Sequence, residues 1–101
     1  MEQFLPINVA DAKRLIKERG AILADIRDED SYQKSHVSGS IHLTNQTLVS
    51  LLEENDLLTP VIVMCYHGIS SQGAAQYLLH QGLEEVYSLE GGFEAWSRES
   101  A

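Results

Sequence analysis

The chain has 101 residues, of which 44% are hydrophobic and 22% charged, and this predicts one globular domain over residues 1–101. Its formal charge of −8 argues against nucleic acid and anionic membranes as partners, and no apolar run reaches the length of a membrane span. The single cysteine excludes an internal disulfide and favours a reducing compartment, so we expect a cytoplasmic protein.

Residues 8–26 predict a helix followed by a strand. Asn8 is suited to cap the helix, and Asp11 occupies the capping-box position three residues later. Apolar residues recur at helical spacing until Gly20, which predicts the end of the helix. The apolar run at 21–26 then predicts a short buried strand.

Two residues of opposite charge, Asp25 and Arg27, lie at the end of this strand. We expect them to form an ion pair or loop clamp that holds the edge of the sheet. The alternative is that Arg27 contributes positive charge to a binding site nearby. Residues 30–35 follow and predict one helical turn with Tyr32 facing inward.

Two histidines, His36 and His42, lie in the next loop, which leads into a short extended segment. Each is a candidate acid, base or metal ligand. Together with His67 and Cys65, however, they fit no compact spacing of metal ligands. We therefore expect hydrogen-bonded structural histidines, with no metal and no cofactor.

The second half of the chain alternates helices and strands. A helix begins near residue 44 and Pro60 ends the connection after it, while four apolar residues at 61–64 predict a strand buried on both faces. A helix from about 70 to 81, a strand at 85–89 and a last helix with Phe93 and Trp96 follow. This alternation predicts a three-layer α/β domain, whose central parallel sheet of four or five strands has helices on both faces.

Cys65 lies where strand 61–64 ends. In a parallel sheet this is the carboxyl edge, where ligands bind. The turn and the N-terminus of the next helix offer amides and partial positive charge, which favour a thiolate and an anionic substrate. We expect Gly68 to adopt a positive φ and Ser70 or Ser71 to cap the helix. The alternative is an inert buried cysteine; the polar turn favours a nucleophile.

The distribution of basic residues limits how this turn holds an anion. Six of the seven lie before Ser35 and the seventh is Arg98, so no lysine or arginine lies between Ser35 and Ser97. We therefore expect backbone amides and hydroxyl groups to bind the anion. Arg27 is the best placed candidate for a cation near the site.

Several segments resemble the rhodanese (sulfurtransferase) family, and in particular its short single-domain bacterial thiosulfate sulfurtransferases. Residues 25–28 resemble its Asp-x-Arg motif, and residues 31–41 resemble its Tyr-x-x-x-His-(Ile/Val)-x-Gly-Ala-Ile segment. Residues 65–70 resemble its six-residue active loop, and residues 90–96 its closing motif. These segments occur in the family's order and span nearly the whole chain.

The resemblance implies sulfur transfer through Cys65. The thiolate takes the outer sulfur of thiosulfate, sulfite leaves, and a Cys65 persulfide passes the sulfur to a thiophilic acceptor. That acceptor is cyanide in an assay, or a thiol or thioredoxin in the cell. The substrate-binding groups are mainly the backbone amides of Tyr66, His67, Gly68, Ile69, Ser70 and Ser71. Ile69 stands where relatives often carry a polar side chain, which leaves donor and acceptor preference open.

Other functions remain as alternatives. Cysteine phosphatases and arsenate reductases need an arginine after five intervening residues, where this chain has Ser71. Non-catalytic rhodanese-like binding modules typically lose the cysteine or the loop glycine, and Cys65 and Gly68 are both present. A sulfur carrier charged by a partner protein is not separated from thiosulfate use by the sequence. The sequence does not reveal the oligomeric state, and we take a monomer as the default.

Overall fold

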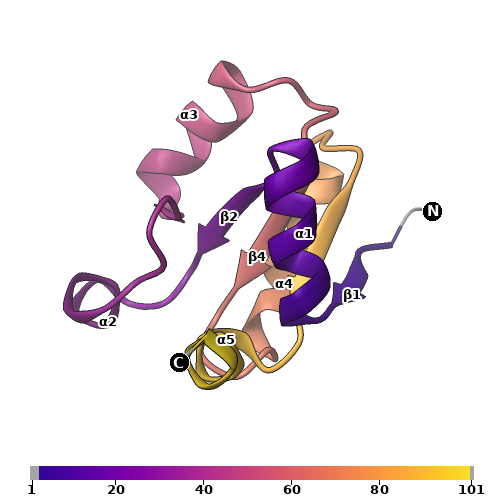
Figure 1. Ribbon diagram of the computed structural model, residues 1–101. Helices are drawn as coiled ribbons and strands as arrows, with labels where there is room; N and C mark the ends of the chain where they lie inside the picture. The colour runs from indigo at the N-terminus through magenta and orange to yellow at the C-terminus, as the bar shows by residue number, and fades with distance from the viewer. Residues whose placement is uncertain (1–2, 101) are drawn as a thin grey trace.

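A computed structural model describes residues 3–100. Five parallel strands form one sheet in the order β1-β5-β4-β2-β3. The strands are β1 (Leu5–Ile7), β2 (Ile22–Asp25), β3 (Ile41–His42), β4 (Val61–Met64) and β5 (Val86–Leu89). The helices are α1 (Val9–Arg19), α2 (Glu29–Lys34), α3 (Asn45–Glu54), α4 (Ser70–His80) and α5 (Gly92–Ser100). Figure 1 shows α1 in front of the sheet and α4 behind it.

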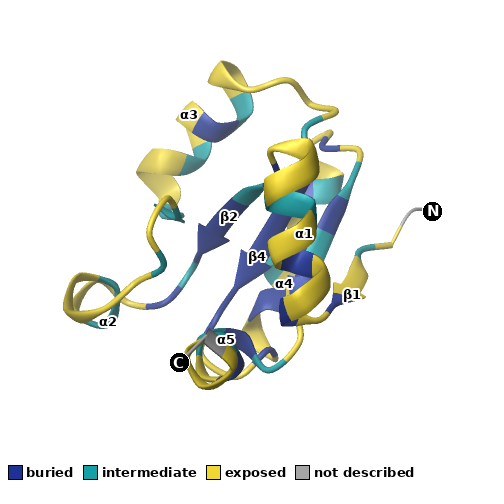
Figure 2. Ribbon diagram, viewed as in Figure 1, coloured by how far each residue is buried: buried dark blue, intermediate teal, exposed yellow. Residues whose placement is uncertain are grey.

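Helices cover both faces of the sheet, so the predicted three-layer α/β fold is confirmed. Side chains of α1 and α5 pack on one face, where Ile62 and Met64 of β4 point. Side chains of α3 and α4 pack on the other face with Val61 and Val63. All four residues of β4 are therefore fully buried, as predicted, and Figure 2 shows this strand dark blue at the centre of the molecule.

The ends of α1 follow the local sequence signals. The side chain of Asn8 accepts a hydrogen bond from the amide of Asp11 at 2.7 Å, and Gly20 ends the helix at φ +66°. At α3, Thr44 and Thr47 form a reciprocal capping box. The predicted cap at Asn8 and the predicted helix end at Gly20 are confirmed, because each depends on residues only three or four positions apart.

Strand β1 was not predicted. It is three residues long and contains Pro6, which cannot donate a ladder hydrogen bond. It pairs only with β5, at the edge of the sheet, where proline is tolerated. β3 is shorter still, at two residues, and corresponds to the predicted extended segment.

The predicted ion pair at the end of β2 is confirmed. Arg27 Nη2 lies 2.8 Å from Asp25 Oδ2, and both side chains are almost completely buried. The same nitrogen donates to the carbonyl of Ser35 at 2.7 Å, and the guanidinium lies over the ring of Phe93, with Cζ 3.7 Å from the ring centre. The pair thus ties the end of β2 to the end of α2 and the start of α5.

The histidines of the following loop are hydrogen-bonded, as expected. His36 Nδ1 lies 2.7 Å from the carbonyl of Tyr32, and His42 Nε2 lies 2.6 Å from the carbonyl of Arg27. Both rings stack on Tyr32, whose hydroxyl donates to the carbonyl of Ser40. Tyr32 is half-buried between the two histidines and does not pack in the core of the domain, so the expectation that it faces inward is met only in part. Within residues 3–100 no three side chains of the metal-ligating kinds come together, and no helix is long and apolar enough to cross a membrane.

Candidate active site

The candidate site is the turn between β4 and α4, at the carboxyl edge of the sheet. Cys65 follows the last residue of β4 directly and is 5% exposed. The chain then turns through Gly68, whose φ of +91° is the predicted left-handed value, and enters α4 at Ser70. This turn brings the first amides of α4 back to the cysteine.

Three groups of the turn surround the Cys65 sulfur. Sγ accepts hydrogen bonds from the amides of Gly68 at 3.1 Å and Ser71 at 3.2 Å, and it lies 3.4 Å from the hydroxyl oxygen of Ser71. Burial raises the pKa of the Cys65 thiol, but the hydrogen bonds from Ser71, Gly68 and the amide of His67 outweigh it and lower the pKa overall. The geometry therefore favours the thiolate.

The expected cap of α4 is wrong. The N-cap residue is Ile69, and no side chain caps the helix. At most helix N-termini a capping side-chain oxygen accepts a hydrogen bond from an amide in this position. Here the Ser71 amide donates to the cysteine sulfur instead. The Ser71 side chain is fully buried beneath the turn. The sulfur thus takes the place of a capping group, and the helix end provides a donor to it.

Carbonyl groups of the turn are bound from outside it. The amides at the start of α5 donate to the turn: that of Phe93 to the carbonyl of Cys65 at 2.7 Å and that of Glu94 to the carbonyl of Tyr66 at 3.1 Å. The side chain of Gln72 donates to the carbonyl of Gly68 at 2.9 Å. These hydrogen bonds were not predicted from the sequence; the signal that could have indicated them is the Gly91-Gly92 pair at the start of the last helix.

Gly92 allows this close contact between α5 and the turn. Its φ is +59°, and a Cβ atom there would lie 2.4 Å from the carbonyl oxygen of Cys65. Gly68 is equally confined, since its Cβ would lie 2.8 Å from the amide nitrogen of Gly91. Both distances are too short for any side chain, so the two glycines hold the turn against the start of α5.

The remaining side chains of the turn lie at the surface around Cys65. Tyr66 is 48% exposed and Ile69 75% exposed, and Ser70 is also exposed. His67 Nδ1 lies 3.4 Å from a carboxylate oxygen of Glu94, with both side chains largely in solvent. Of the six loop residues expected to bind substrate, Gly68 and Ser71 donate amide hydrogen bonds to the sulfur, and the amide of His67 also helps to lower its pKa. The side chains of Tyr66, His67, Ile69 and Ser70 are exposed around the entrance.

Arg27 lies beneath this entrance. Its Cζ atom is 5.6 Å from the centre of the Tyr66 ring, while its hydrogen bonds go to Asp25 and the carbonyl of Ser35. The carboxylate of Asp25 neutralises the guanidinium at a distance of 2.8 Å. The contacts of Arg27 therefore fit the expected structural role, an ion pair that holds the edge of the sheet.

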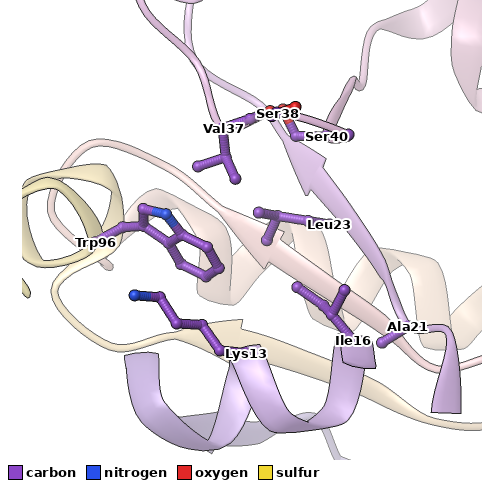
Figure 3. Close-up of a pocket in the computed structure, with 9 residues that line it drawn as sticks. Lys13, Ile16, Ala21, Leu23, Val37, Ser38, Ser40 and Trp96 are labelled. Atoms are coloured by element: carbon purple, nitrogen blue, oxygen red, sulfur yellow. The ribbon is translucent and has the colours of Figure 1, made fainter. Parts of the chain in front are cut away.

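A cavity of about 190 Å³ lies elsewhere, between α1, α5 and the loop at 37–40. Figure 3 shows Trp96 and Lys13 on one side of it and Leu23 and Ile16 on the other. Lys13 Nζ lies 5.3 Å from the centre of the Trp96 ring. No residue of the turn at 65–71 lines this cavity, so it is separate from the candidate site.

Comparison with known proteins identifies related chains. The family model of the rhodanese-like domain matches residues 8–99. A rhodanese-related protein from Thermoplasma volcanium is 27% identical with a TM-score of 0.77, and the match covers 95% of this chain and 93% of that one. A Rhodopseudomonas palustris protein of unknown function, described as a possible tyrosine phosphatase, is 25% identical with a TM-score of 0.80, covering 97% and 83%.

A third structure shares the fold at lower identity. The thiosulfate sulfurtransferase from Pseudomonas aeruginosa has a TM-score of 0.83 and 19% identity. The match covers 97% of this chain but only 19% of that protein. At this identity the likeness shows the fold alone.

Proposed function

The chain belongs to the rhodanese-like domain family, and from that premise we propose that it is a thiosulfate sulfurtransferase with Cys65 as its nucleophile. The observation that carries the proposal is the pair of amide donors to the sulfur, from Gly68 and Ser71, together with the Ser71 hydroxyl oxygen 3.4 Å away, which accepts from the thiol. Such donors stabilise a thiolate, which is the reactive form of cysteine.

The proposed reaction has two steps. The Cys65 thiolate attacks the outer sulfur of thiosulfate, the sulfur–sulfur bond breaks, and sulfite leaves with the electron pair. An acceptor nucleophile then attacks the outer sulfur of the Cys65 persulfide and releases the thiolate. Each step exchanges one sulfur–sulfur bond for a new bond to sulfur, so no redox cofactor is needed. Cyanide serves as the acceptor in an assay, and a cellular thiol or thioredoxin is our proposal for the cell.

The loop amides of residues 66–71 are proposed to hold the negative charge of thiosulfate and of the persulfide. Since no lysine or arginine lies between residues 35 and 97, we assign the stabilisation of this negative charge to the peptide dipoles of the loop. The carbonyls of Cys65, Tyr66 and Gly68 are already bound by other donors, which supports an arrangement in which the loop amides serve the anion.

The same absence of cations disfavours a phosphatase. A cysteine phosphatase uses a guanidinium group in its loop to bind the phosphoryl oxygens. Ser71 occupies that position, and its hydroxyl is buried against Ser88 rather than open to a substrate. The guanidinium of Arg27 is engaged by Asp25.

A second candidate is a sulfur carrier that a partner protein charges. The observation that favours it is the exposed apolar surface of Tyr66 and Ile69 at the entrance to Cys65. A small hydrophilic anion such as thiosulfate gains no binding energy from these side chains, whereas a protein surface can bury them.

In either case we propose that residues 1–101 act as a single monomeric domain in the cytoplasm, where the single thiol stays reduced.

The test is the intact mass of the protein after incubation with thiosulfate and again after addition of cyanide. We expect a gain of one sulfur atom, its loss with cyanide, and no gain in Cys65→Ser. A protein that gains sulfur only from a protein persulfide supports the carrier. A protein that gains sulfur from neither donor contradicts both functions and leaves a binding module.

A further inference from the structure

Two buried hydroxyl groups continue from the Cys65 sulfur into the protein. Ser71 Oγ lies 3.4 Å from Sγ, and Ser88 Oγ lies 2.7 Å from Ser71 Oγ. Ser71 is fully buried and Ser88 is 3% exposed. Within residues 3–100, Ser71 is the one side-chain partner that the structure gives the Ser88 hydroxyl. A hydroxyl group buried in an apolar core destabilises the protein unless it is hydrogen-bonded, and here each of the two hydroxyls has a partner in a row of three atoms, Cys65 Sγ, Ser71 Oγ and Ser88 Oγ. Apolar side chains would fill these positions without that requirement, which suggests a role for the row.

The row ends at an open cavity that borders the turn at Gly68. Ser88 lines this cavity of about 350 Å³ together with Phe4, Pro6, Gly68, Gln72 and Glu90. The cavity is large enough for several water molecules and is bordered by a carboxylate. A route of hydrogen-bonding atoms therefore connects the buried sulfur with solvent through β5.

We propose that the hydroxyls of Ser71 and Ser88 form a proton relay that carries the thiol proton of Cys65 to water in this cavity. The thiol donates its proton to Ser71 Oγ, the Ser71 proton moves to Ser88 Oγ, and the Ser88 proton moves to a water molecule. Three O–H or S–H bonds break and three O–H bonds form, with the positive charge leaving as hydronium.

The relay also leaves the hydroxyls correctly oriented. After the transfer, the Ser71 hydroxyl donates to the sulfur anion and the Ser88 hydroxyl donates to Ser71. Ser71 is thus in direct contact with the reacting atom, whereas Ser88 is a positioning residue that acts through Ser71. In this state each hydroxyl proton has an acceptor within the row, and the anion gains a charge-assisted hydrogen bond.

Other titratable groups surround the turn without bonding to the sulfur. They are the Asp25–Arg27 pair at the end of β2, Tyr66 and His67 of the turn itself, Glu94 of α5 and Glu90 after β5. Asp25 and Arg27 bind each other, and His67 lies beside Glu94. The groups hydrogen-bonded to Sγ are the amides of Gly68 and Ser71, the Ser71 hydroxyl and the amide of His67, and Ser88 is connected to Sγ through the Ser71 hydroxyl.

The test uses the fact that Cys65 is the only cysteine. Alkylation by iodoacetamide, followed by intact mass across a pH series, reports the ionisation of this one thiol. The variants are Ser88→Ala and the matched pair Ser88→Thr and Ser88→Val, which have nearly the same volume and differ by the hydroxyl. The cavity beside Ser88 leaves room for the added methyl group in both members of the pair. Urea unfolding of each variant confirms that it is folded.

We expect Ser88→Ala and Ser88→Val to shift the alkylation midpoint upward by about one pH unit, which slows the reaction about tenfold below the midpoint. Ser88→Thr should remain close to the wild type. The relay requires Ser88 to orient the Ser71 hydroxyl towards the sulfur anion, and this hydrogen bond to the anion is what lowers the midpoint. Equal midpoints in all four proteins would show that Ser88 does not do so and would overturn the relay, and so would equal shifts in Ser88→Thr and Ser88→Val. The proposal rests on the proposed function only in taking Cys65 as the reacting group. Because the assay contains no thiosulfate, a failure of the relay is distinct from a failure of sulfur transfer.

Discussion

Replacing Gly92 by alanine tests whether the start of α5 supports the cysteine turn. The added Cβ would lie 2.4 Å from the carbonyl oxygen of Cys65 and 2.7 Å from both the carbonyl carbon and oxygen of Tyr66. These are backbone atoms, so no side-chain rotation relieves the overlap. The turn and the helix must therefore separate.

The expected cost has two parts. A left-handed backbone conformation costs a non-glycine residue about 1–2 kcal/mol. Separation also weakens the hydrogen bonds from Phe93 to Cys65 and from Glu94 to Tyr66, which contribute about 1 kcal/mol each. We therefore expect Gly92→Ala to lower the free energy of unfolding by about 3–4 kcal/mol, a loss that a protein of ordinary stability survives.

Gly20→Ala is the matched control. Gly20 has a similar φ of +66°, but a Cβ there meets nothing within 4 Å. Urea unfolding should therefore show a loss of only about 1–2 kcal/mol for Gly20→Ala. Alkylation of Cys65 should be slower in Gly92→Ala and unchanged in Gly20→Ala, because only the former displaces the amides from the sulfur. Equal unfolding free energies and equal alkylation rates in the two variants would refute the argument.

Three further predictions follow from the contacts. Asp25→Asn leaves the buried charge of Arg27 without its partner and should cost about 3–5 kcal/mol in urea unfolding, whereas Asp11→Asn at an exposed ion pair should change little. Because the pKa of Cys65 is lowered in the folded protein, the thiolate should add to the free energy of unfolding of the wild type, relative to Cys65→Ser, at pH values above the unfolded thiol pKa of about 8.5. This added stability should disappear as the pH falls through the pKa of the folded protein. A stability difference that grows towards acid pH in urea unfolding would contradict the lowered pKa. Hydrolysis of an aryl phosphate should be undetectable; hydrolysis abolished by Cys65→Ser would contradict the sulfurtransferase assignment.

The sequence predicted the parts of the fold that depend on local signals. The caps at Asn8 and Gly20 and the apolar run of β4 are each contained within a few residues. Strand β1 was not predicted because three residues with a central proline show no hydrophobic periodicity. These residues form a strand only by pairing with β5, about eighty positions later in the chain.

The candidate site was predictable in position but not in its supports. Cys65 at the end of a buried strand, followed by Gly68 and a helix, places a thiol beside amides by connectivity alone. The expected serine cap failed because the same amide had two possible acceptors, and only the folded turn decides that the sulfur is nearer. Ser88 was overlooked because a single serine in a strand has no distinctive spacing. The role proposed for Ser88 depends on its hydrogen bond with Ser71, seventeen positions earlier in the chain.

These supports explain how an acidic protein with no cation in its loop can stabilise an anion. A peptide turn presents carbonyls as well as amides, and carbonyls facing the sulfur would repel a thiolate. Here the N-terminal amides of α5 and the side chain of Gln72 bind three of the turn's carbonyls, while the amides of Gly68 and Ser71 bind the sulfur. The two helices therefore have complementary roles: α5 engages the negative ends of the peptide dipoles, and α4 contributes a positive end to the sulfur. A loop built in this way depends on the glycines that bring it against α5 more than on any particular loop side chain. This explains how an apolar residue, Ile69, can occupy a solvent-exposed position beside Cys65.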